Sequence, residues 1–290
     1  MLSGHSIVTV GNSVLIKVSE IGLKKLDFNP HLYFILGMPR WYFKKVKLSK
    51  NKVKFELMSE DGTEYKNYFS LEKNGESKKI DSVEISKDNL SITINGNERY
   101  SSTDLMLNNQ NFIPAFKILY IGQAKGSNLS RNAQDRLSSH STLQKVLADI
   151  NDSKLEYDVR LLLFSTREDK IATTLDSGKY ATIQVDEILN FPDDNNHINL
   201  IEAKLINYFK PEYNKKFKEN YVPSMNHSSY IKYYEQKYNS MIISLLNIGL
   251  CSFFTNEVEE FNSLQDRIDY SILGEDNFYE SLIKPFFNKE

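Results

Sequence analysis

Ile118-Leu119-Tyr120-Ile121-Gly122-Gln123-Ala124 is the stretch that decides how the rest of this chain is interpreted. It is an apolar run of strand length that contains one tyrosine and one glycine. A strand of this kind delivers Tyr120 to an edge, and Gly122 allows backbone or substrate to approach closely because it has no Cβ. The stretch therefore predicts a β-strand whose end carries a functional site.

Charged side chains follow this strand at helical spacing. Arg136 and His140 are four residues apart and so share one helix face. Glu202 lies on a later helix between Ile201 and Ala203, where a carboxylate is costly unless it is paired or binds a metal. A tyrosine, an arginine, a glutamate and a divalent cation form a plausible set for hydrolysing a phosphodiester. The cation polarises the phosphate, arginine neutralises the developing charge, and a phenol or imidazole handles the proton.

Three segments differ in pattern and in charge. Residues 1–112 alternate polar and apolar side chains between turn residues, which predicts a β-rich domain that could select a substrate or partner. Residues 113–225 read as a mixed α/β domain with helices from Ser141 and from Asn196 to Lys210. Residues 226–290 read as an acidic, aromatic-rich extension of helical or mixed structure. The expected fold class is therefore α+β.

The motifs in residues 113–220 resemble the GIY-YIG nuclease superfamily. Tyr120-Ile121-Gly122 is similar to its second half-motif, Arg136 and His140 have its Arg-x-x-x-His spacing, and Glu202 and Asn214 match its metal-binding glutamate and late asparagine. The resemblance implies a three-stranded sheet flanked by helices, with one Mg²⁺ or Mn²⁺ on Glu202. It also implies that Tyr120, Arg136, His140 and Glu202 are catalytic, while Gly122, Lys125 and Asn214 contact the substrate.

One part of the family pattern has no counterpart near the strand. No Gly-Ile-Tyr stands about ten residues before Tyr120, where the sequence reads Asn108 to Pro114. Either Tyr120 or His140 then takes the role of general base, or the site is catalytically weakened. Two functions remain open on this evidence. The first is a metal-dependent nuclease, by analogy one of restriction, mobile elements or phage defence, and the second is a non-catalytic module that binds nucleic acid or protein.

Each of these residues also has a structural interpretation. Tyr120 is compatible with a packed sheet aromatic, and Glu202 with a surface ion pair to Lys204 or Lys210. Asn214 is compatible with a residue that only turns the chain after Pro211. The sequence does not decide between these roles and the functional ones.

Composition narrows the class of protein. The 290 residues carry a net charge of −2, which argues against coating nucleic acid by bulk electrostatics. The charge is uneven, because residues 1–112 hold 16 basic and 13 acidic side chains and residues 226–290 hold 5 and 10. A single cysteine, Cys251, excludes a disulfide framework and a cysteine-based zinc cluster. The N-terminus has no secretory pattern, and the apolar run Met241–Phe254 is too short to span a bilayer.

These observations lead to expectations about partners and compartment. We expect a cytoplasmic protein that acts on nucleic acid, most readily DNA, and that does not bind membranes. Tyrosines at 230, 233, 234 and 238 have helical spacing, which predicts a packing face for the preceding domain, for a second copy in a homodimer, or for another protein.

Overall fold

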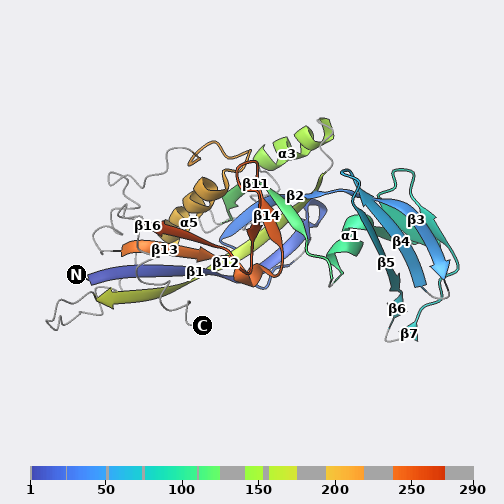
Figure 1. Ribbon diagram of the computed structural model, residues 1–290, viewed down its shortest axis with the longest axis horizontal. Helices are drawn as coiled ribbons and strands as arrows, with labels where there is room; N and C mark the ends of the chain where they lie inside the picture. Colours follow the sequence, from blue (N-terminus) through green and yellow to red (C-terminus); the bar gives the residue numbers. More distant parts are fainter. Residues whose placement is uncertain are drawn as a thin grey trace. The chain divides into compact units, whose positions relative to one another are not determined.

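The computed structural model describes residues 2–23, 25–49, 52–73, 76–109, 111–124, 141–152, 157–174, 194–218 and 238–271 (Figure 1). The chain divides into two compact units. Unit 1 comprises Met1–Leu36, Lys117–Val146 and Arg160–Glu290, and unit 2 comprises Gly37–Phe116 and Leu147–Val159. Along the sequence, most of unit 2 is therefore inserted between Leu36 and Lys117.

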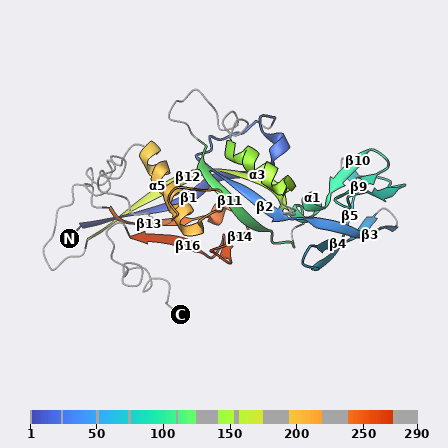
Figure 2. The ribbon, with the colours of Figure 1, turned by 90° about the horizontal axis from the view of Figure 1, so that it is seen from above.

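A mixed eight-stranded sheet is the largest element of the structure. Its strands lie in the order β15 (Phe261–Asn262), β14 (Ser252–Phe254), β11 (Ala115–Gln123), β2 (Leu32–Pro39), β12 (Tyr157–Thr174), β1 (Leu2–Lys17), β13 (Tyr238–Ser244) and β16 (Arg267–Ser271). β1 pairs antiparallel with β12 and parallel with β13, which pairs antiparallel with β16. The two ends of the described chain thus share one sheet, and these four strands run side by side in Figures 1 and 2.

β1 is one continuous strand, whereas its Gly11-Asn12 pair predicts a turn between two strands. The pairing with β12 passes from Val10 opposite Thr166 to Ser13 opposite Phe164, so two residues of β1 face one residue of β12. This is the arrangement of a β-bulge. The Asn12 N–H donates to Ser165 Oγ at 2.9 Å, which satisfies a backbone group that the bulge removes from the ladder.

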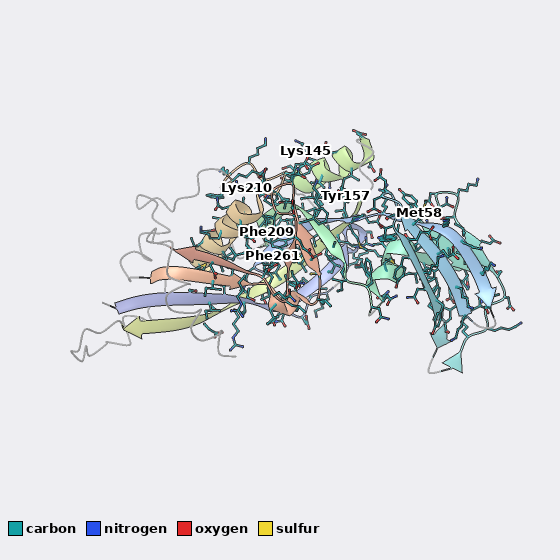
Figure 3. The ribbon with its side chains drawn as sticks, viewed as in Figure 1. Met58, Lys145, Tyr157, Phe209, Lys210 and Phe261 are labelled. Carbon is teal, nitrogen blue, oxygen red and sulfur yellow. The ribbon has the colours of Figure 1, made fainter. Side chains whose placement is uncertain are left out.

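Two long helices accompany the sheet, α3 (Ser141–Asp152) and α5 (Asp194–Phe209). Both agree with the amphipathic patterns in the sequence, and α3 buries Leu143, Val146 and Ile150. In unit 1, five fully buried phenylalanines form the centre of the core: Phe34, Phe164, Phe209, Phe253 and Phe261. Their rings meet edge to face, with Phe209 and Phe261 5.2 Å apart (Figure 3). No helix of the described residues is long and apolar enough to cross a membrane.

Unit 2 contains two small antiparallel sheets. One has the order β3 (Trp41–Ser49), β4 (Lys52–Ser59) and β5 (Glu64–Ser70), and the other has the order β10 (Glu98–Ser101), β9 (Ser91–Ile94) and β8 (Val83–Ile85). A two-stranded ribbon, β6 (Glu72–Lys73) and β7 (Glu76–Ser77), and a short helix, α1 (Ser102–Leu107), complete it. Trp41 packs against Tyr65 and Phe112, so the single tryptophan belongs to an aromatic cluster within this unit.

The expected fold class is wrong in two respects. Strands dominate the described residues, and the structure has a mixed sheet of eight strands where the resemblance implies a sheet of three. The expected helical or mixed C-terminal extension consists of β13, β14, β15 and β16 with one short 3₁₀ turn, η2 (Leu246–Ile248), within residues 238–271. Tyr238, the last member of the tyrosine stripe with helical spacing, begins β13. The apolar run after Tyr238 is a buried strand, which periodicity alone does not distinguish from a buried helix.

Candidate active site

Tyr33 of β2 lies beside Tyr120 of β11. Their ring centroids are 5.9 Å apart and the ring planes are inclined by 34°. The Ala124 N–H donates to the His31 carbonyl at 2.8 Å, and Tyr33 lies against Gly122. β2 and β11 are adjacent strands of the large sheet. Tyr33 and Tyr120 are therefore neighbours on one face of the sheet.

Gly122 is required by the approach of these two rings. A Cβ at this position would lie 2.6 Å from Tyr33 Oη and 2.7 Å from Tyr120 Cε1, distances that real Cβ contacts do not reach. Tyr33 is only 2% exposed, while Tyr120 is partly exposed. The absence of a side chain at Gly122 therefore lets a buried phenol and a more accessible phenol lie together at the end of β11.

His31 precedes Tyr33 by two residues and is held on β12. The Thr166 N–H donates to His31 Nδ1 at 3.0 Å, and Thr166 Oγ1 lies 2.9 Å from the same atom. Because Nδ1 accepts this backbone bond, the neutral ring carries its proton on Nε2. The imidazole is thus fixed in one tautomer.

Glu202 of α5 is hydrogen-bonded to the residue that follows Gly122. Gln123 Nε2 donates to Glu202 Oε2 at 2.7 Å and to Asn199 Oδ1 at 2.5 Å. Asn199 and Glu202 are three apart on α5 and both are partly exposed, so the amide of Gln123 bridges one side of the helix. Gln123 therefore fixes the orientation of the carboxylate.

The tyrosines and the carboxylate approach the end of β11 from its two faces. Side chains alternate along a strand, so Gln123 points away from the face of Tyr120 and Gly122. α5 lies on the side of Gln123, because Phe209 packs on Phe34, whose side chain is on the opposite face of β2 from Tyr33. Both groups adjoin the point where β11 ends and residues 125–140 follow.

α5 is anchored near both of its ends. His197, in its first turns, lies 3.5 Å from Glu168 Oε2 of β12, and Ser6 Oγ of β1 donates to Glu168 Oε1. At the other end, Thr255 Oγ1 donates to the Phe209 carbonyl at 2.6 Å. These contacts restrict sliding of the helix and so hold Glu202 in register with Gln123.

Asn214 is bound to the backbone of β11. Its Oδ1 accepts from the Ile121 N–H at 2.9 Å, and its Nδ2 donates to the Ile121 carbonyl at 2.8 Å. The Tyr213 N–H donates to the Leu119 carbonyl at 3.0 Å, and Lys117 Nζ lies 3.7 Å from Glu212 Oε2. Asn214 is 7% exposed and both ends of its amide are engaged, so in this structure it supports β11 at Ile121.

The remaining residues predicted from the sequence are Lys125, Arg136 and His140, and they lie outside the described residues. The structure therefore brings together Tyr120 and Gly122 on one face of β11 and supports β11 with Asn214. It connects Glu202 to the same strand end through Gln123. Sequence analysis missed Tyr33, His31 and Gln123. The short apolar run that begins at Leu32 is the sequence signal for a strand carrying Tyr33. Tyr33 stands 87 residues before Tyr120, whereas the family pattern has its first half-motif about ten residues before.

The oxygen atoms at Glu202 suit a hard divalent cation. The described residues hold no group of three or more His, Cys, Asp or Glu side chains that could bind a metal ion. Mg²⁺ does not need such a group, because it retains several waters and binds through one or two carboxylates. Glu202 Oε2 is hydrogen-bonded by Gln123 as metal-binding carboxylates are, and Asn199 adds an amide oxygen. Carboxylate and amide oxygens are ligand types that Mg²⁺ and Mn²⁺ accept in proteins.

Comparison of the chain with protein-family models, with curated proteins and with solved structures finds no significant match.

Proposed function

We propose that this chain is a divalent-metal-dependent nuclease that hydrolyses phosphodiester bonds of nucleic acid, DNA in the first instance, in the cytoplasm. The observation that carries the proposal is the close packing of Tyr33, Tyr120 and Gly122 at the strand end where Gln123 holds Glu202. The GIY-YIG resemblance needs two tyrosines on paired strands, and Tyr33 is the candidate for the first of them. Restriction, mobile-element or phage-defence work is the biological setting that we propose by analogy.

A phosphate beyond the end of β11 would meet Tyr120 from one face of the strand and a cation on Glu202 from the other. The two phenols divide the work at the attacking water. Tyr120 is the more accessible ring, so its oxygen positions the water. As the phenolate, once the phenol has given its own proton to solvent, this oxygen receives the proton of the attacking water. Tyr33 is buried against Tyr120 and fixes the position of that ring. Arg136, carried over from the resemblance, neutralises charge on the pentacoordinate phosphorus, and His140 is the second candidate for proton transfer.

Glu202 is the metal-binding residue of this proposal. A bound Mg²⁺ or Mn²⁺ supplies Lewis-acid polarisation of the phosphate and stabilises the leaving oxygen. Gln123 directs Oε2 of Glu202, and the anchored α5 keeps this carboxylate at the end of β11. Asn214 keeps β11 straight at Ile121, so that Tyr120 and Gly122 retain their positions.

The test is a cleavage assay with plasmid and single-stranded DNA, in Mg²⁺, Mn²⁺ or EDTA. We compare the wild-type chain with Glu202→Gln and Tyr120→Phe, and with Glu259→Gln as a matched control at an exposed carboxylate. Cleavage that needs the cation, fails in both site variants and persists in the control supports the proposal. Cleavage unaffected by EDTA or by Glu202→Gln contradicts the site assignment, and binding without cleavage favours a non-catalytic binding module.

A further inference from the structure

The outer face of the β3-β4-β5 sheet in unit 2 carries a concentration of lysines. The strand registers pair Lys47 with Lys54 and Lys54 with Tyr68, and in the next row Lys45 with Glu56 and Glu56 with Lys66. Residues directly opposite each other in a sheet share a face. Val53, Phe55 and Leu57 of β4 alternate with the outward residues and are buried. Figure 1 shows the three strands side by side.

The outward side chains of these three strands line an open groove of about 330 Å³. Four of its lining residues are Lys45, Lys47, Lys54 and Lys66, and only one, Glu56, is acidic. The groove runs across all three strands, so positive charge extends over the width of the sheet. A surface of this kind attracts a polyanion through several contacts at once.

The carboxylates near the groove, Glu56 and Glu64, form ion pairs with Lys44 and Lys66. Lys66 lies 3.9 Å from Glu56 and 3.7 Å from Glu64, and Lys44 pairs with Glu64. The hydrogen bond and charge of Lys44 lower the pKa of Glu64 and keep it ionised. Within the described part of the chain, Lys45, Lys47 and Lys54 form no ion pair. Their charges are thus available to an external anion.

An exposed aromatic ring lies among these lysines. Tyr68 is 54% exposed, and Lys52 Nζ lies 4.5 Å from its ring centroid. A tyrosine on a charged outer face gains little by packing there, whereas the flat ring is suited to stacking on a nucleobase. A row of lysines beside an aromatic ring is the arrangement that proteins use for single strands, where phosphates meet the cations and a base meets the ring.

We propose that the β3-β4-β5 face binds single-stranded nucleic acid, with Lys45, Lys47 and Lys54 contacting phosphates and Tyr68 stacking on a base. The choice of nucleic acid as the polyanion rests on the proposed nuclease function, and the face gives that function a substrate-binding surface. A single strand fits better than a duplex, because the bases of a duplex are already stacked and do not offer a free face to Tyr68.

The experiment measures binding of the full-length chain in EDTA, so that cleavage does not interfere. A fluorescently labelled oligothymidylate, a labelled hairpin duplex and labelled polyglutamate are the probes, and anisotropy is recorded over a range of salt concentrations. The charge-reversed variant is Lys47→Glu with Lys54→Glu, and Tyr68→Ala is the second variant. The matched control is Lys79→Glu with Lys87→Glu, which changes the net charge of the same unit equally at exposed lysines away from the groove.

The variant with Lys47→Glu and Lys54→Glu should weaken oligothymidylate binding about tenfold or more. It should also reduce the slope of log affinity against log salt by about 1.4, since two phosphate contacts are lost from a single strand. Tyr68→Ala should weaken the same complex by about tenfold and leave duplex binding unchanged. The control pair should stay within about twofold of the wild type, because unlocalised charge contributes little at physiological salt.

Several outcomes overturn the inference. Equal losses of oligothymidylate affinity in the groove variant (Lys47→Glu with Lys54→Glu) and in the control variant mean that net charge alone attracts the nucleic acid. Tighter binding of the hairpin than of oligothymidylate removes the single-strand assignment, and preferential binding of labelled polyglutamate assigns the face to an acidic protein segment. Failure of the nuclease proposal is separate, because it appears as absent Mg²⁺-dependent cleavage while groove-dependent binding in EDTA persists.

Discussion

Tyr33 and Tyr120 lie in contact at the end of β11, although the sequence of unit 2 stands between them. Tyr33→Phe should reduce cleavage about 100-fold if its hydroxyl holds Tyr120 in the reactive arrangement, since misplacing a reacting group by about 1 Å can cost that much. The ring and its packing remain, so the unfolding midpoint should stay within a few degrees of the wild type. Single-turnover cleavage and thermal unfolding measure the two effects. If Tyr33→Phe cleaves at the wild-type rate, the hydroxyl of Tyr33 has no role in the reaction and the residue contributes only packing.

Gly122→Ala should damage both stability and activity. The added Cβ meets Tyr33 Oη and Tyr120 Cε1 at 2.6 and 2.7 Å, and overpacking of this kind costs about 1–3 kcal/mol of unfolding free energy. Gly11→Ala is the comparison, since its nearest atom is the Ser165 hydroxyl at 2.9 Å, on a small side chain that can rotate away by giving up one hydrogen bond from the Asn12 N–H. Urea denaturation of both variants measures the difference. Equal losses of unfolding free energy in Gly122→Ala and Gly11→Ala would show that the rings of Tyr33 and Tyr120 move aside at little cost.

The fold and the site were predictable to different extents. Local patterns identify α3, α5 and β4 because buried positions recur along each of them with the period of a helix or of a strand. These local patterns do not reveal that β1 lies between β12 and β13, since the sequence of a strand does not specify which strands pair with it. Tyr33 was missed for the same reason, because the pairing of β2 with β11 spans unit 2. Gln123 was missed because its role depends on a contact with α5.

Gln123→Leu should weaken metal binding without disturbing the fold. It removes the 2.7 Å hydrogen bond that orients Glu202 Oε2, and loss of such a partner typically costs 10–100-fold in metal affinity. Titration with Mn²⁺ followed by electron paramagnetic resonance gives the affinity directly, independent of cleavage. Gln265→Leu, at an exposed position, is the control. Unchanged Mn²⁺ affinity in Gln123→Leu would remove Gln123 from the metal site.

Asn214→Ala should lower the unfolding free energy by about 2–6 kcal/mol. The substitution leaves the buried N–H and carbonyl of Ile121 without the amide that satisfies both, and each such group costs about 1–3 kcal/mol. Asn207→Ala is the comparison, because Asn207 also donates to backbone carbonyls, at 3.3 and 3.2 Å, but in a more exposed setting. Its cost should be below about 1 kcal/mol. Similar losses in the two variants would indicate that water replaces the Asn214 amide.

Lys204→Met should stabilise the protein at neutral and acidic pH and lose this advantage in alkali. Lys204 on α5 is 6% exposed, and burial lowers the pKa of its ammonium from 10.5 to about 7. Between these values the unfolded chain binds more protons than the folded one, so wild-type stability rises with pH by at most about 1.4 kcal/mol per unit. Below pH 7 both states are protonated and the full penalty of a buried charge remains. Methionine removes that penalty, so the difference in unfolding free energy between variant and wild type should be largest near pH 6 and shrink toward pH 10. Urea denaturation across this range measures it, with the exposed Lys215→Met as a pH-independent control. A constant difference from pH 6 to pH 10 would mean that Lys204 keeps its charge in the folded state through local polar contacts or water.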